Sequence, residues 1–139
     1  MTAPRLVEVG RPSRATTVLT RYSIVRGAKA STLPAGVRQD TRKHTRHVLR
    51  PTEELVEAVL GHADDPAAWK RFEKDYRALL EQRFVDDRAR FDALAALARR
   101  ETVHLGCNCP TAKNPDVRRC HTTLALAFMK KKYPDLDVR

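Results

Sequence analysis

The clearest alternation of apolar and polar residues runs over Thr102–Cys107. Val103 and Leu105 share one side of an extended chain, so this stretch predicts a short strand with one buried face. Thr16–Val25 is rich in β-branched residues and predicts a second strand, and a weaker alternation over Arg5–Val9 predicts another.

Three stretches instead carry apolar residues at every third or fourth position, which predicts helices. The first begins at Pro51, with Thr52 as its cap, and ends at Gly61. The second begins at Asp65-Pro66, and the third is capped by Asp86 or Asp87 and ends near Arg100. The middle helix carries an aromatic stripe from Trp69 to Phe84. A stripe with this spacing is far more often core than a cofactor platform, so we assign it to packing.

A fourth helix is predicted to begin near Pro115 and to run to about Lys132. Asn114-Pro115-Asp116 has the order of an N-cap, a first-turn proline and an acid near the positive helix end. In that helix Cys120 lies on the apolar stripe as a core residue. If the helix instead begins at Arg119 or Cys120, the thiol lies in the first turn, where backbone N–H groups favour the thiolate. The start of this helix therefore decides the chemistry of Cys120.

Gly27–Arg50 is polar, basic and without a period, so we interpret it as a loop whose length favours a binding role. Leu136–Val138 is a candidate final strand, and the order strand, helix, strand predicts a parallel crossover. The expected fold is one α/β domain over residues 1–139, with a small, open, partly parallel sheet and about four helices. Ligands of such sheets bind beyond the carboxyl ends of strands, where Cys107–Cys109 lies.

The formal charge of +10 is concentrated near the N-terminus. Residues 1–50 hold eleven of the 27 Lys and Arg residues but two of the 17 acidic residues. A basic segment of this kind attracts phosphate-bearing partners, either nucleic acid or nucleotide. The alternative is a solvated, solubilising surface, because aromatic residues are not interleaved with the basic ones.

Composition also constrains the compartment. No early segment has the pattern of a signal peptide, and no apolar run approaches the roughly 20 residues of a membrane span, so we expect a soluble, cytoplasmic protein. The three cysteines are clustered and odd in number, which favours reduced thiols over structural disulfides.

Three hypotheses compete for this cysteine-rich stretch with the simple alternative of core thiols. In the first, Cys107, Cys109, Cys120 and His121 bind zinc or iron, for which their number and type are right, although their spacing differs from that of zinc fingers. In the second, Cys120 or Cys109 is a nucleophile whose pKa is lowered by His121 or neighbouring arginines. The chain is then a cysteine- or zinc-dependent enzyme, and the sequence leaves enzymatic activity open.

In the third hypothesis, basic side chains and the backbone N–H groups of a helix start form a cradle for an anion. The side chains are Arg26, Lys29, Arg118 and Arg119. This arrangement binds a phosphate-bearing ligand without any unusual thiol.

Three motifs resemble the YeaO-like proteins, a bacterial domain family of unknown function. The most specific is His62-Ala63-Asp64-Asp65-Pro66 followed by Trp69, Phe72 and Tyr76. Arg50-Pro51-Thr52-Glu53-Glu54-Leu55 is similar to the family's Pro-Ser-x-x-Leu helix start, and Arg26-Gly27-Ala28-Lys29 to its upstream Arg-Gly segment. The resemblance implies a compact α/β fold and no established activity. It departs at Cys107-Asn108-Cys109 and Cys120-His121, where many YeaO-like members have no cysteine.

Overall fold

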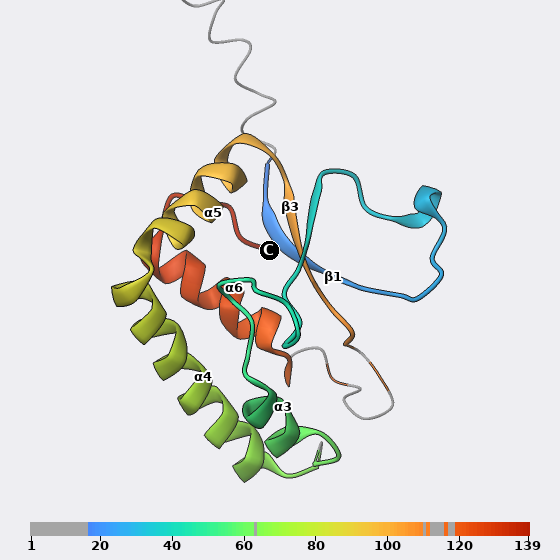
Figure 1. Ribbon diagram of the computed structural model, residues 1–139. Coiled ribbons are helices and arrows are strands. Elements are labelled where there is room, and N and C mark those ends of the chain that lie inside the picture. Colours follow the sequence, from blue (N-terminus) through green and yellow to red (C-terminus); the bar gives the residue numbers. More distant parts are fainter. Residues whose placement is uncertain (1–16, 63, 110, 112–115, 117–118) are drawn as a thin grey trace, which may run out of the picture.

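Three parallel strands form the centre of the protein in a computed structural model, which describes residues 17–62, 64–109, 111, 116 and 119–139. The strands are β1 (Leu19–Ser23), β2 (Val37–Asp40) and β3 (Val103–Cys107), in the sheet order β1-β3-β2. Figure 1 shows this open sheet beside the helices. The predicted α/β fold, with a small open sheet and about four helices, is confirmed.

Four α-helices follow the strands along the chain. They are α3 (Glu53–Val59), α4 (Pro66–Asp86), α5 (Arg88–Arg100) and α6 (His121–Lys132). Two begin at caps that the sequence predicts: the Thr52 side chain accepts from the N–H of Leu55, and the Asp65 side chain accepts from two N–H groups of the first turn of α4. Gly61 follows α3 at a positive φ of 79°, which suits a glycine at a helix end.

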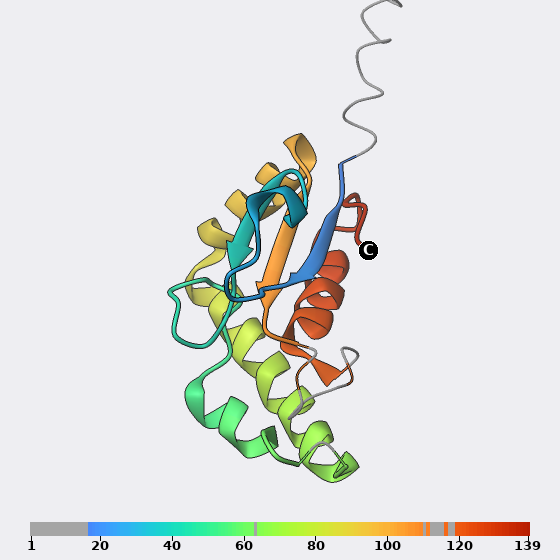
Figure 2. The same cartoon turned by 90° about the vertical axis from the view of Figure 1, so that its right-hand side faces the viewer.

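The helices lie on one side of the sheet, and the segment between β1 and β2 lies on the other (Figures 1 and 2). Leu19, Val103 and Leu105 point to the helical side and are fully buried. They pack into one core with the inward faces of α4, α5 and α6, including Tyr76, Leu80, Phe91, Leu124 and Phe128. The sheet is therefore anchored through the alternation that defines β1 and β3.

Two sequence predictions are wrong in part. Gly27–Arg50 is not entirely loop, because it contains β2 and the 3-10 helix η1 (Ala30–Thr32). Only Val37 of β2 is apolar, so side-chain pattern could not reveal a strand whose order comes from backbone pairing with β3. The last helix begins at His121 and not near Pro115, which lies outside the described residues. The observed start is therefore one residue after Cys120, the later of the starts that we considered.

The C-terminal end of the chain adds one bridge to the sheet. Arg5–Val9 lies outside the described residues. The candidate strand at Leu136–Val138 is reduced to one parallel bridge between Val138 and Leu19. In the described part of the chain, no helix has both the length and the apolar character needed to span a membrane.

Candidate functional site

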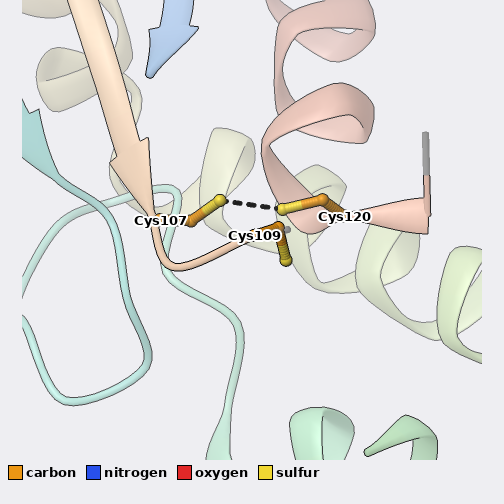
Figure 3. A group of neighbouring side chains, drawn as sticks. All are labelled: Cys107, Cys109 and Cys120. Carbon is orange, nitrogen blue, oxygen red and sulfur yellow. Dashed lines mark hydrogen bonds between the residues drawn. The ribbon is translucent and has the colours of Figure 1, made fainter. Parts of the chain in front are cut away.

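Three cysteines meet where β3 ends and α6 begins. Cys107 is the last residue of β3, Cys109 follows two residues later, and Cys120 is the N-cap of α6. The Sγ atoms of Cys107 and Cys120 face each other at 3.0 Å (Figure 3), and all three sulfurs lie within 4.8 Å of one another. All three are free thiols, with Cys109 half-buried and the other two buried. The fold thus brings together the sulfurs that the sequence places 13 residues apart.

Arg21 and Thr122 hold the sulfurs in this arrangement. Arg21 Nη2 donates to Cys107 Sγ at 3.3 Å and to the Cys109 carbonyl at 2.8 Å, while its Nε donates to Thr122 Oγ1 at 3.1 Å. The Thr122 hydroxyl donates in turn to Cys120 Sγ at 3.2 Å. One guanidinium from β1 therefore fixes the end of β3 and, through Thr122, the N-cap of α6.

These contacts shift the pKa values of the two facing thiols in opposite directions. Hydrogen bonds from Cys109, Cys120 and Arg21 hold the pKa of Cys107 well below its ordinary value, although burial opposes them. The pKa of Cys120 is raised because its hydrogen bonds with Cys107 and Cys109, and its burial, favour the protonated form. Two sulfurs so close in a buried site do not readily both carry charge, so the pair loses its first proton more readily from Cys107 than from Cys120.

His121 is held as a neutral ring beside this pair. The Thr41 hydroxyl donates to the carbonyl of Gly106 at 2.9 Å, so its oxygen accepts a hydrogen bond from the Nε2–H group of His121 at 2.8 Å. This leaves Nδ1 without a proton, at 3.9 Å from Cys120 Sγ. Burial lowers the pKa of His121 to about 4, so the ring is uncharged at neutral pH.

A cavity of about 500 Å³ opens beside the sulfurs. One wall is apolar and comes from α3 and the start of α4, with Val56, Val59, Leu60, Trp69 and Phe72. Another part is basic and polar, with Arg42, Lys43, His44 and Arg119, and the three cysteines and His121 also border the cavity. The cavity lies at the carboxyl end of β3, as predicted for a parallel sheet. Its size suits a small-molecule ligand.

Arg42 and Lys43 of the cavity differ in how strongly neighbouring carboxylates bind them. Arg42 forms a bidentate ion pair with Asp40, with its Nη2 2.7 Å from Oδ2, and its Nη1 donates to Asn108 Oδ1 at 3.0 Å. The Arg42 guanidinium accordingly holds the pKa of Asp40 below its ordinary value. Lys43 Nζ is 4.0 Å from a carboxylate oxygen of Glu53, whose side chain is 70 % exposed. The ammonium of Lys43 is therefore the more readily turned toward an anion.

Contacts distant in sequence fix the loop that carries Arg42 and Lys43. The Tyr76 hydroxyl donates to the carbonyl of Leu49 at 2.5 Å, and Arg83 donates to the carbonyls of Val48 and Arg50. Both donors lie on α4, so the long helix holds the end of this loop, residues 48–50, in place.

The predicted ligand-binding arginines and lysine separate into two groups. Arg119 lines the cavity, whereas Arg26 and Lys29 are exposed after β1 and do not belong to its lining. Arg118 lies outside the described residues. Trp69, which we assigned to packing, also lines the cavity.

Sequence reasoning missed Arg21, Thr122, Arg42 and Lys43. A signal existed for Arg21, because it lies two residues from the buried Leu19 and therefore faces the same side of β1. A charged residue on a buried strand face indicates a buried partner.

The family model DUF488-N3a, described as the active DUF488-N3 subclade, matches residues 11–133. YeaO-like proteins are members of the DUF488 family, so the match supports the resemblance at this broader level. No curated protein and no solved structure shows significant similarity to the chain.

The half-buried His47 and the buried His121 predict a loss of stability in mild acid. Burial lowers the pKa of both His47 and His121 to about 4, against about 6.5 in an unfolded chain. Between these values the unfolded chain binds more protons, so the free energy of unfolding falls as pH decreases from about 6.5 to about 4, by up to roughly 3 kcal/mol per histidine. His121→Gln retains an N–H donor for Thr41 and should flatten this dependence in urea unfolding followed by Trp69 fluorescence. His62→Gln, at an exposed histidine, is the control. If the free energy of unfolding depended on pH in the same way in both variants, His121 would not be the source of this dependence.

Proposed function

The chain belongs to the DUF488-N3a family, the active DUF488-N3 subclade, and on this premise we propose that it is an enzyme that acts on a small phosphate-bearing molecule. The observation that carries the proposal is one cavity lined by thiols, by basic side chains and by an apolar wall. A ligand with a phosphate and a planar apolar part, such as a nucleotide, matches these three surfaces.

The basic part of the cavity accounts for phosphate recognition. Arg42 and Lys43 belong to the basic N-terminal region, and Arg119 precedes α6, so residues distant in sequence present positive charge to the same space. The apolar wall accounts for the rest of the ligand, since Trp69 and Phe72 stack with ring centroids 5.1 Å apart and both border the cavity. A cavity of about 500 Å³ suits a mononucleotide better than a nucleic-acid strand.

The sulfurs supply the chemistry of the proposed reaction. The Cys107 thiolate attacks an electrophilic carbon or phosphorus of the bound molecule, and the leaving group departs with a proton from the Cys120 thiol, which is 3.0 Å from the nucleophile. The predicted catalytic residues thus assist Cys107: Cys120 serves as the proton donor and His121 as a neutral base. Arg21 keeps the nucleophile in place through its hydrogen bond to Cys107 Sγ.

Measurements of nucleotide binding can distinguish a site in the cavity from one at the exposed basic residues outside it. Lys43→Ala should weaken binding of ADP or pyrophosphate about tenfold, as expected for loss of one contact to phosphate, in isothermal titration calorimetry. Lys29→Ala is the matched control, because Lys29 is exposed and does not line the cavity. Equal effects of the two substitutions would contradict the cavity proposal. So would binding of single-stranded nucleic acid without binding of either small probe.

A metal-dependent enzyme is the second candidate, because three sulfurs lie within 4.8 Å of one another. Three thiolates suit zinc or iron, and three protein ligands with a fourth position open to a cavity are the usual set of a catalytic zinc. Hydrogen bonds from Arg21 and Thr122 to the sulfurs resemble the outer contacts that orient metal ligands. A zinc ion bound here would supply a Lewis acid at the cavity.

The zinc hypothesis makes a separate prediction about His121. Its Nε2 is engaged by Thr41, and the three-sulfur group does not include it, so His121→Gln should retain the metal. Cys109→Ser should lower zinc affinity about 100-fold because it removes one of three ligands. Competition with a chromophoric chelator measures both affinities, and cobalt substitution reports thiolate ligation. Zinc affinity that is unchanged by Cys109→Ser would contradict the three-cysteine site.

A further inference from the structure

Two buried sulfurs are already close to bonding distance. Cys107 Sγ and Cys120 Sγ are 3.0 Å apart, whereas the S–S bond of a disulfide is about 2.05 Å. Cys120 has an extended backbone, with φ of −131° and ψ of 147°, because it is the N-cap and not part of the helix. Its side chain can therefore turn toward Cys107 without unwinding α6.

The third sulfur lies within reach of the pair and nearer to solvent. Cys109 is half-buried, whereas Cys107 and Cys120 are each 2 % exposed, and all three border the cavity. A small oxidant that enters the cavity can thus reach all three sulfurs. A thiol from solution meets Cys109 first.

From this geometry we propose that Cys107 and Cys120 are a redox pair that a hydroperoxide oxidises to a disulfide, with Cys109 as the thiol through which the pair is reduced again. This activity does not depend on the proposed nucleotide chemistry. It requires only the distances between the sulfurs and access from the cavity.

The reaction balances in two steps. Cys107 sulfur attacks an oxygen of the hydroperoxide, the O–O bond breaks, and the alkoxide takes up a proton from solvent and leaves as an alcohol. The Cys120 sulfur then attacks the sulfenic acid on Cys107, and hydroxide leaves as water with the thiol proton. Cys109 attacks the disulfide, and two equivalents of an external thiol complete the reduction by exchange.

Polar groups around the pair remain satisfied after oxidation. Arg21 loses an anionic acceptor at Cys107 but still donates to the Cys109 carbonyl and to Thr122 Oγ1. The disulfide therefore does not leave the guanidinium without a partner. Its formation also joins β3 to α6, which already pack together.

The test uses the full chain, reduced and freed of metal with a chelator, and one equivalent of cumene hydroperoxide. We expect the free thiols, counted after unfolding, to fall from three to one, and peptide mapping to show a disulfide between Cys107 and Cys120. The folded protein should react at least about tenfold faster than the urea-unfolded chain, because only folding brings these sulfurs together. This readout requires no substrate, so it is independent of nucleotide binding.

Two variants separate the roles of the sulfurs. Cys109→Ser should still lose both remaining thiols to oxidation, but glutathione should reduce its disulfide more slowly than that of the wild type. The double variant Cys109→Ser/Cys120→Ser, which has no second thiol near Cys107, should accumulate a sulfenic acid on Cys107 that dimedone traps. Retention of three thiols in the wild type, or a disulfide that includes Cys109 as the main product, would overturn the proposal. The mapping of the wild-type protein decides the matter even if a variant does not fold.

Discussion

The hydrogen bonds of one arginine connect the three segments around the cysteines. Arg21 of β1 contacts the sulfur of Cys107, the carbonyl of Cys109 and the hydroxyl of Thr122, which joins an edge strand, the segment after the central strand and the first turn of α6. Hydrogen bonds with a charged partner are each worth about 1.5–3 kcal/mol, more than neutral ones. Because a guanidinium stays charged at any physiological pH, it also favours the thiolate beside it.

The parallel sheet determines where this chemistry occurs. Cys107 stands at the carboxyl end of the central strand, and Cys120 at the start of the helix that follows, so the crossover itself places two thiols face to face. The proposed nucleophile, metal ligands and redox pair are then three uses of the same sulfurs. A bound metal excludes the disulfide, and a disulfide removes the nucleophile, so the state of these cysteines would control what the cavity can do.

Local patterns predicted most of the fold, and long-range contacts account for what they missed. Val103 and Leu105 revealed the central strand, and Thr52 and Asp65 revealed helix starts, because each acts on its immediate neighbours. The edge strand around Val37 has no such pattern, since its order comes from pairing with β3. The convergence of the cysteines was predicted, but the position of Lys43 was not, because it depends on a loop held from α4.

The protonation of Cys107 is the property that tests this account most directly. Thiolate absorbance at 240 nm, measured on folded and urea-unfolded protein from pH 5 to 9 with a chelator present, reports it without any substrate. The folded protein should carry about one thiolate per chain well below pH 8, and the unfolded chain none there. Arg21→Gln should move the signal to higher pH, and Arg26→Gln on the exposed segment should leave it unchanged. Absorbance that appears only above about pH 8.5 in the folded protein, as in the unfolded chain, would contradict it.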